Sequence, residues 1–179
     1  AADAVRGADV VITCMSTSLD VEQVLTGTTL QSMTAGATLL DCTSGDPATS
    51  RRIAQLLGER KVAFVDAPVS GGVKGAVEGT LTVMCGGEAK DLERVKPVIA
   101  SFGTKVVHCG PVGSGDAVKA MNQALLALTI WGTGEALVAL SKAGVSAEVA
   151  LDVINASSGR SNASMNQFPE RAIGRRFPR

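Results

Sequence analysis

The stretch Thr38–Pro47, TLLDCTSGDP, has the pattern of a β-strand followed by a loop and the start of a helix. Its first half, Thr38–Cys42, has the length and apolar composition of a buried β-strand. Asp46 and Pro47 are the residue types that favour a helix N-cap and the first helical position. A strand, a short loop and a helix in this order form the repeating unit of an α/β layer.

Similar strand-like runs occur on both sides of this stretch, at Asp9–Met15, Val62–Ala67, Leu81–Cys85 and Lys105–His108. Most are continuously apolar rather than alternating, as expected for strands that are covered on both faces. Helices are predicted between several of them. One begins at Asp20, with Gln23 in the capping-box position, and another covers Glu88–Ser101. The sequence therefore predicts a doubly wound, Rossmann-like, mostly parallel sheet of the α/β class.

The pattern changes after Gly115, where helices replace the alternation. Residues from Gly115 to Ala143 predict one long helix, and Ser146–Ala156 predicts a second, with Ser146 as its N-cap. No strand is predicted in the tail from Ser157 onward, which is rich in Ser, Asn, Gly and Arg. We place the boundary between two domains at this change and expect them to cover 1–112 and 113–179.

Composition excludes several classes of function. The chain has 17 basic and 17 acidic residues, a formal net charge of zero, and 45% hydrophobic residues. This balance argues against a nucleic-acid-binding surface. The basic run RRFPR at 175–179 predicts a solvated tail. The apolar run 124–140 approaches the length of a membrane span, but it contains Glu135 and glycines, so we predict a buried helix and no membrane association.

The cysteines and the single histidine predict structural roles. Cys14, Cys42, Cys85 and Cys109 show no CxxC spacing, and each ends an apolar run. We interpret them as small buried side chains in a reducing compartment. His108 also ends a strand-like run and has no second histidine nearby, so no metal site is predicted.

A lysine on the apolar long helix is the first candidate for chemistry. Asn122 and Gln123 lie three and four residues after Lys119 and therefore share its helix face. A lysine in a partly desolvated cleft has a lowered pKa and exchanges protons near neutral pH. The alternative is a structural lysine whose ammonium group reaches water at the domain edge.

Three strand ends carry polar or flexible loops. Ser70, Gly71 and Gly72 follow the strand that ends at Ala67, and a hydroxyl with flexible backbone N–H groups is a suitable seat for a carboxylate. The stretches CMSTSLD at 14–20 and DCTSGDP at 41–47 have the same strand-to-helix design. In open α/β sheets, ligands gather at the carboxyl ends of the strands. Each loop alone is also compatible with an ordinary capped turn.

In combination, these motifs resemble the β-hydroxyacid dehydrogenases, a family that includes 3-hydroxyisobutyrate dehydrogenase and tartronate semialdehyde reductase. The resemblance rests on VITCMSTSLDVEQVL, LLDCTSGDP, FVDAPVSGGVKGAVEGTLTVMCGG and HCGPVGSGDAVKAMNQ, in this order. It implies that 1–112 is the C-terminal part of a dinucleotide-binding domain. It also implies that 113–179 holds the interdomain helix and the start of an all-α substrate or oligomerisation domain.

The resemblance also implies residue roles. Lys119 matches the family's catalytic lysine, and Ser70, Gly71 and Gly72 match the loop that holds the substrate carboxylate. Asn122 matches an asparagine that orients the substrate, although many members place it four residues after the lysine, where this chain has Gln123.

Cofactor contacts are implied at the two loops after the first strands of the chain. Met15 and Ser16 fall where the family usually has Leu-Pro beside the cofactor. Asp20 falls where members often carry a polar contact. Ser44, with Thr43 beside it, falls at the nicotinamide-side Ser or Thr. The implied cofactor is NAD or NADP.

The chain differs from the family pattern in one further respect: it has no GxGxxG dinucleotide fingerprint. We expect a fragment of a cytoplasmic oxidoreductase that acts on a short 3-hydroxy acid or its semialdehyde. The alternative is a non-catalytic binding or assembly module that keeps the fold and binds no dinucleotide. With the fingerprint strand absent, Asp9–Met15 is expected to form an open apolar sheet edge, which predicts homo-oligomerisation.

Overall fold

A computed structural model describes residues 1–176. The chain divides into two compact units, the first spanning Ala1–Ala120 and the second beginning at Met121. The first unit holds a six-stranded sheet. Its first three strands, β1 (Val10–Thr13), β2 (Thr38–Asp41) and β3 (Ala63–Asp66), are parallel neighbours in that order. Their carboxyl ends therefore meet at one edge of the sheet.

The direction of the sheet reverses beyond β3. The chain continues into β4 (Val69–Ser70), and both β3 and β4 pair antiparallel with β5 (Leu81–Gly86). The last strand, β6 (Gly103–Gly110), runs parallel to β5. The predicted α/β fold with a mostly parallel sheet is confirmed. The two-residue strand β4 was not predicted, because Pro68 ends the apolar run before it.

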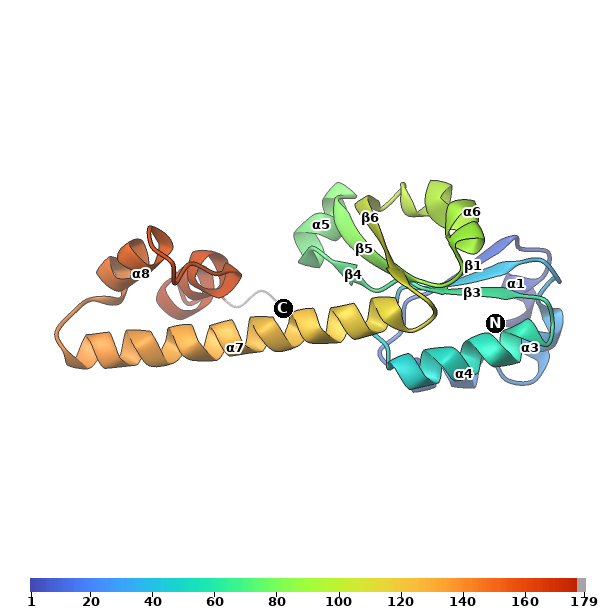
Figure 1. Ribbon diagram of the computed structural model, residues 1–179, viewed down its shortest axis with the longest axis horizontal. Coiled ribbons are helices and arrows are strands. Elements are labelled where there is room, and N and C mark those ends of the chain that lie inside the picture. Colours follow the sequence, from blue (N-terminus) through green and yellow to red (C-terminus); the bar gives the residue numbers. More distant parts are fainter. Residues whose placement is uncertain (177–179) are drawn as a thin grey trace. The chain divides into compact units, whose positions relative to one another are not determined.

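Helices cover both faces of the sheet, as the continuously apolar strands predicted. On one face lie α1 (Ala2–Val5), α2 (Ser18–Val24), α3 (Thr28–Ser32) and α4 (Pro47–Gly58). On the other lies α6 (Ala89–Ile99), and α5 (Gly72–Glu78) follows β4. Figure 1 shows α4 and α6 on opposite sides of the strands.

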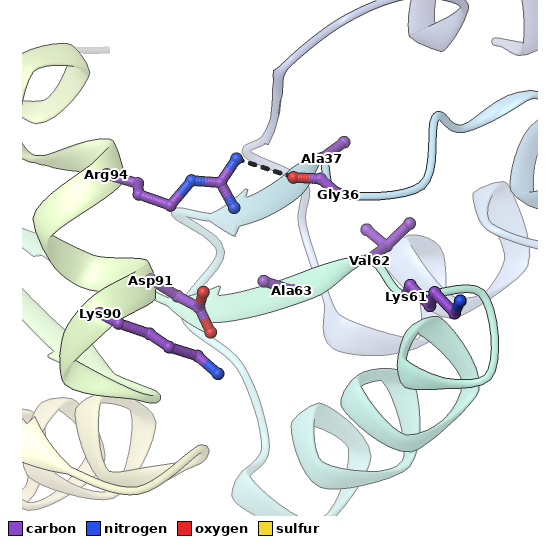
Figure 2. Close-up of a pocket in the computed structure, with 8 residues that line it drawn as sticks. All are labelled: Gly36, Ala37, Lys61, Val62, Ala63, Lys90, Asp91 and Arg94. Atoms are coloured by element: carbon purple, nitrogen blue, oxygen red, sulfur yellow. Dashed lines mark hydrogen bonds between the residues drawn. The ribbon is translucent and has the colours of Figure 1, made fainter.

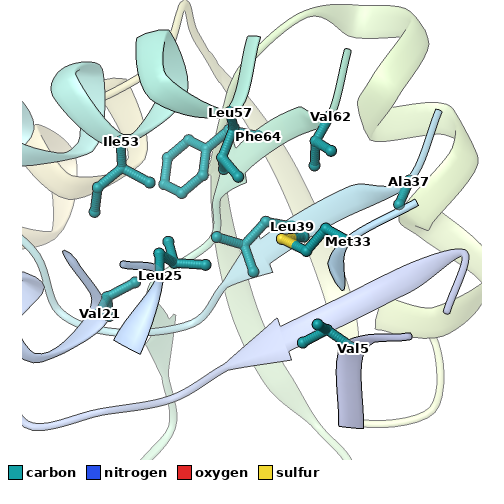
Figure 3. Close-up of a cluster of buried hydrophobic side chains, with 10 residues drawn as sticks. All are labelled: Val5, Val21, Leu25, Met33, Ala37, Leu39, Ile53, Leu57, Val62 and Phe64. Carbon is teal, nitrogen blue, oxygen red and sulfur yellow. The ribbon is translucent and has the colours of Figure 1, made fainter. Parts of the chain in front are cut away.

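Adjacent residues of the central strands pack against helices on opposite faces of the sheet. Leu39 and Phe64 belong to the core under α4, whereas their neighbours Leu40 and Val65 belong to the core under α6. Figure 3 shows the first of these clusters, in which side chains of α2 and α4 lie over β2 and β3. Because successive side chains on a strand point to opposite faces, a strand between two helical layers must be apolar throughout.

Two helix starts can be compared with their predictions. Asp46 caps α4 as predicted, and its carboxylate accepts a hydrogen bond from the Thr49 amide at 2.8 Å. The predicted capping box at Asp20 and Gln23 is wrong. Thr17 is the N-cap of α2, and Asp20 occupies the third helical position, where its carboxylate accepts a hydrogen bond from the Thr17 amide at 2.9 Å.

The sheet edge at β1 is open within the described residues. In residues 1–176, β1 pairs with β2 on one side and with no strand on the other. Ile12, in the middle of β1, is 50% exposed. An exposed strand with an apolar side chain is a template for pairing with another chain.

The second unit is helical. The long helix α7 (Ser114–Lys142) begins in the first unit and continues into the second, where α8 (Ala147–Asn155) follows it. Leu137 of α7 packs against Leu151 of α8. The segment η1 (Ala163–Ile173), a helix with π-type hydrogen bonds, was not predicted. Of the predicted solvated tail at 175–179, residues 177–179 lie outside the described residues.

The prediction that residues 124–140 form a buried helix is wrong. Met121, Leu125 and Leu128 are each more than 60% exposed, and Trp131 is 73% exposed. The helix packs at its beginning and near Leu137, so its middle turns remain uncovered. By length and composition alone, α7 is also able to cross a membrane.

Candidate active site at the strand ends

Side-chain hydrogen bonds join the carboxyl ends of β1 and β2. The Asp41 carboxylate accepts hydrogen bonds from Thr13 Oγ1 at 2.9 Å and from the Thr43 amide at 3.0 Å. The Thr43 hydroxyl in turn accepts one from the Met15 amide at 3.0 Å. These bonds hold the two loops that carry the predicted cofactor residues against each other.

The predicted cofactor residues differ in their exposure. Met15, Ser16 and Ser44 are exposed at this edge of the sheet. Thr43 is 1% exposed, and its hydroxyl is used inside the protein. One carboxylate oxygen of Asp20 is already bonded to the amide and hydroxyl of its own helix cap. Of the predicted cofactor residues, Met15, Ser16 and Ser44 are therefore the ones whose side chains are exposed at these loops.

A buried aspartate connects the end of β3 to the start of α7. Asp66 is 0% exposed, and its carboxylate accepts hydrogen bonds from the amides of Gly113 at 2.7 Å and Asp116 at 3.1 Å. Side chains have no room here. A Cβ on Gly86 would lie 2.5 Å from the Asp66 carboxylate, and one on Gly115 would lie 2.8 Å from it. The glycines therefore allow the helix start to approach the strand end.

A second buried aspartate connects α7 to the loop after β2. Asp116 is 1% exposed, and its carboxylate accepts hydrogen bonds from the Gly45 amide at 3.1 Å and from Ser50 Oγ at 2.6 Å. In the same loop, the Asp46 amide donates to Ser18 Oγ at 2.7 Å. The loops after β1 and β2 and the first turn of α7 are thus joined by buried hydrogen bonds.

Burial determines the electrostatics of this edge. Desolvation raises the pKa values of Asp41 and Asp66, and it raises the pKa of Asp116 to about 6. The negative charge of Asp66 raises the pKa values of the other two carboxyls further. Within residues 1–176, none of the three forms an ion pair. No group of three His, Cys, Asp or Glu side chains in that range is arranged to hold a metal ion.

Lys119 lies one turn after Asp116 on α7. Its Nζ donates a hydrogen bond to the backbone carbonyl oxygen of Val69 at 2.8 Å. Partial burial lowers the pKa of Lys119. Val69 immediately precedes Ser70, so the lysine ammonium group is held beside the Ser70–Gly72 loop.

The conformation of the Ser70–Gly72 loop requires glycine. Gly71 has φ +143° and Gly72 has φ +62°, both in the region that other residues disfavour. In addition, a Cβ on Gly71 would lie 2.9 Å from Leu81 Cδ2. Ser70 is the last residue of β4 and Gly72 is the first residue of α5. The backbone of the loop is therefore held in one conformation beside the Lys119 ammonium group.

The other predicted substrate residues are exposed. Asn122 and Gln123 lie on α7 within the second unit. Their roles in orienting a substrate stay predictions.

A hollow of about 410 Å³ lies at the other end of the parallel strands. It is lined by Gly36, Ala37, Lys61, Val62, Ala63, Lys90, Asp91 and Arg94. In Figure 2, Arg94 reaches the carbonyl oxygen of Gly36, to which it donates a hydrogen bond at 2.7 Å. Ala37 and Ala63 lie at the amino ends of β2 and β3, whereas the predicted site residues lie at the carboxyl ends. None of the predicted site residues therefore lines this hollow.

The histidine and two of the four cysteines have the structural surroundings that were predicted, and Cys109 is partly exposed. His108 Nε2 lies 2.8 Å from the Gly87 carbonyl oxygen. Cys42 and Cys85 are buried, which raises the pKa of each thiol to about 12. The prediction of burial is wrong for Cys14, which is exposed at the end of the edge strand β1.

Sequence reasoning missed the buried carboxylates that hold this site together. Asp41 and Asp66 each end an apolar strand, in LLD and FVD, and a carboxylate that ends a buried strand requires donors nearby. Asp116 directly follows the Gly-Ser-Gly that opens α7. No local signal identifies Ser50 as its partner, because these two residues are 66 positions apart.

Two family models match consecutive parts of the chain. Residues 1–110 match the NAD-binding domain of 6-phosphogluconate dehydrogenase. Residues 113–179 match the model described as the NAD-binding domain of NADP-dependent 3-hydroxyisobutyrate dehydrogenase. Together they support binding of NAD or NADP.

Relatives of known activity are similar over most of the chain. The NAD-dependent L-serine dehydrogenase of Pseudomonas aeruginosa is 40% identical over 161 residues, which are 89% of this chain and 54% of that protein. The 2-(hydroxymethyl)glutarate dehydrogenase of Eubacterium barkeri is 38% identical over 165 residues, 89% of this chain and 55% of that protein.

A solved structure agrees with these sequence relatives. The 3-hydroxyisobutyrate dehydrogenase of Mycobacterium tuberculosis, determined with L-serine, superposes with a TM-score of 0.89 at 35% identity. The match covers 94% of this chain and 57% of that one, so the chain spans little more than half the length of these relatives. With the matched family models, the sheet and the relatives in agreement, the chain belongs to the β-hydroxyacid dehydrogenase family.

Proposed function

We propose that this chain is part of an NAD(P)-dependent dehydrogenase that interconverts a short 3-hydroxy acid and its semialdehyde. The observation that carries the proposal is the placement of Lys119. Its Nζ is held 2.8 Å from the Val69 carbonyl oxygen, beside the Ser70–Gly72 loop, and its pKa is lowered by burial. A lysine of lowered pKa beside a carboxylate seat is suited to proton transfer at a nearby hydroxyl.

The substrate class follows from chemistry that the relatives' substrates share. 3-Hydroxyisobutyrate, L-serine and 2-(hydroxymethyl)glutarate each have a primary hydroxyl on the carbon next to the one that bears the carboxylate. They differ in the substituent at carbon 2. We propose that this chain acts on 2-substituted 3-hydroxypropanoates. A panel of such acids would identify the preferred substituent.

Each protein group has a separate task in this reaction. The Ser70 hydroxyl and the amides of Gly71 and Gly72 bind the substrate carboxylate, which fixes the hydroxyl relative to Lys119. Neutral Lys119 accepts the hydroxyl proton as the carbonyl group forms, and it returns the proton in the reverse direction. A nicotinamide cofactor held at the loops that carry Met15, Ser16 and Ser44 would supply the hydride acceptor for carbon 3.

The loops after β1 and β2 fit a dinucleotide at the same edge. Met15, Ser16 and Ser44 are exposed there, and the bond between Thr43 and the Met15 amide fixes the two loops relative to each other. We also propose that the protein is a cytoplasmic homo-oligomer and that it uses either NAD or NADP. Each of the relatives named above is a dehydrogenase, which favours a catalytic role over a non-catalytic binding module.

The test measures reduction of NAD and NADP by a panel of 2-substituted 3-hydroxypropanoates. Lys119→Met should lower kcat by about 10²- to 10⁴-fold, the usual contribution of a general acid or base. Lys142→Met is the matched control, since Lys142 is an exposed lysine in the last turn of the same helix. The proposal fails if no hydroxy acid on the panel reduces either cofactor, or if Lys119→Met retains wild-type kcat.

A further inference from the structure

The Asp116 carboxylate is a buried group that the proposed reaction does not use. It lies in the first turn of α7, three residues before Lys119, and is 1% exposed. Its two oxygens accept from different elements, Oδ1 from the Gly45 amide at 3.1 Å and Oδ2 from Ser50 Oγ at 2.6 Å. Gly45 directly follows Ser44, a predicted nicotinamide-side residue. One side chain therefore joins the proposed cofactor loop to the helix of the proposed proton carrier.

Close packing makes this connection specific. A Cβ on Gly45 would lie 2.8 Å from Ser18 Oγ and 3.0 Å from the Asp116 carboxylate. The loop therefore approaches α7 as closely as the absence of a side chain permits. A change in the charge of the Asp116 carboxylate should therefore alter the environment of the Gly45 amide.

The two protonation states of Asp116 hold the loop with different strength. The ionised carboxylate accepts both hydrogen bonds, and bonds to a charged acceptor are about twice as strong as neutral ones. The protonated acid keeps one carbonyl oxygen as an acceptor, while its O–H must be used as a donor. The bond from the Gly45 amide is therefore weaker in the protonated state.

Other charges bear on the Asp116 carboxylate. Asp66 at the end of β3 and Asp41 at the end of β2 disfavour its ionisation. On α4, Asp46 stands at the N-cap, and the Arg51 guanidinium lies near Gly113, where a Cβ would be 2.9 Å from its Nη1. Burial is the largest effect, and it raises the pKa of Asp116 to about 6. The change of state thus falls close to physiological pH.

We propose that Asp116 is a charge-sensitive positioning residue, which as a carboxylate fixes the Ser44–Gly45 loop against the α7 helix and on protonation loosens it. Its relevance to catalysis rests on the proposed function, because the loop would hold the cofactor and the helix carries Lys119. The expected consequence is weaker dinucleotide binding in acid, while the substrate loop at Ser70–Gly72, which Asp116 does not contact, is unaffected.

Amide NMR of the chain tests the connection without any ligand. The Gly45 amide proton and nitrogen shifts should show an inflection near pH 6 in the wild-type protein, because this amide donates directly to Asp116. In Asp116→Asn, an isosteric and permanently neutral side chain, that inflection should be absent. A flat Gly45 titration in the wild type, or the same inflection in Asp116→Asn, overturns the proposal.

A second variant keeps the test decisive if Asp116→Asn fails to fold. Ser50→Ala removes a donor that stabilises the charged form, so the Gly45 inflection should move to higher pH. An unmoved or lowered midpoint contradicts the proposal. Glu59→Gln, at the exposed end of α4, is the matched control, and the wild-type midpoint is expected.

Dinucleotide titrations separate this inference from the proposed function. In the wild type, the Kd for NAD or NADP should rise severalfold between pH 8 and pH 5, whereas in Asp116→Asn this rise should be clearly smaller. If Gly45 titrates as described but no dinucleotide binds, the positioning role stands and the proposed function fails. If dinucleotide binds with a Gly45 amide that does not titrate, the proposed function stands and the positioning role is refuted.

Discussion

Gly115→Ala tests whether the start of α7 is held against the strand ends as described. A Cβ at this position would overlap the backbone carbonyl oxygen of Met84 and lie 2.8 Å from Asp66 Oδ2. Neither neighbour is the free end of a flexible side chain, since one is backbone and the other belongs to a carboxylate whose two oxygens each accept a buried hydrogen bond. The helix start must therefore move away from β3 and β5.

The magnitude follows from three contributions. Overpacking of a close contact costs about 1–3 kcal/mol. Weakening of the two hydrogen bonds to the Asp66 carboxylate adds about 1–3 kcal/mol, whereas the higher helix propensity of alanine offsets about 1 kcal/mol. We expect the first unit to lose about 1–5 kcal/mol of unfolding free energy.

The assay must report on the first unit. Trp131 is the single tryptophan and lies in the second unit, so its fluorescence is unsuitable. Urea unfolding followed by far-UV circular dichroism, with hydrogen exchange of β2 and β5 amides, measures the loss. Gly132→Ala is the control on the same helix. No atom lies within 4 Å of its added Cβ, and it should stabilise the helix by about 0.5–1 kcal/mol. Wild-type exchange rates and stability in Gly115→Ala would show that the start of α7 is not held against the strand ends.

Three further perturbations test the fold and its electrostatics. Leu39→Ala, in the core under α4, should cost about 2–5 kcal/mol in urea unfolding, and a loss below 1 kcal/mol would contradict the packing. Thr17→Ala should cost about 0.5–2 kcal/mol through loss of the α2 capping box, and unchanged α2 exchange rates would contradict that cap. The raised pKa of Asp116 means that the folded state binds more protons than the unfolded state between pH 3.8 and about 6. The unfolding free energy should therefore fall as pH rises through this window, with Asp41 and Asp66 acting in the same direction. Asp116→Asn should reduce that fall, and a rise with pH would contradict the burial of these carboxyls.

The strands were predictable because their signal is local. Thr38–Asp41 and Ala63–Asp66 are continuously apolar up to the final aspartate, and this composition is what two covered faces require. The start of α4 was predictable for the same reason, since Asp46 and Pro47 are adjacent to the helix that they start. The α2 cap was misassigned because both Thr17 and Asp20 begin a plausible box, and only the backbone geometry selects Thr17.

The interior of the site was not predictable from local signals. Asp66 and Asp116 accept hydrogen bonds from residues 47 to 71 positions away, and no spacing rule encodes those partners. The exposure of α7 was mispredicted because an apolar composition shows that a helix can be buried. It does not show whether other elements pack against that helix. The placement of Lys119 beside the Ser70–Gly72 loop agrees with the resemblance, but its bond to the Val69 carbonyl oxygen required the structure.

We infer that Lys119 and the Ser70–Gly72 loop form one site for a short hydroxy acid, and this inference can be tested directly. Its most direct test is an amide NMR titration with 3-hydroxyisobutyrate, in which the Gly71 and Gly72 amides are observed in the wild type and in Lys119→Met. Saturable shifts of both amides are expected in the wild type, with a markedly weaker Kd in the variant. Unchanged Gly71 and Gly72 amides at saturating hydroxy acid, or equal affinity in both proteins, would contradict it.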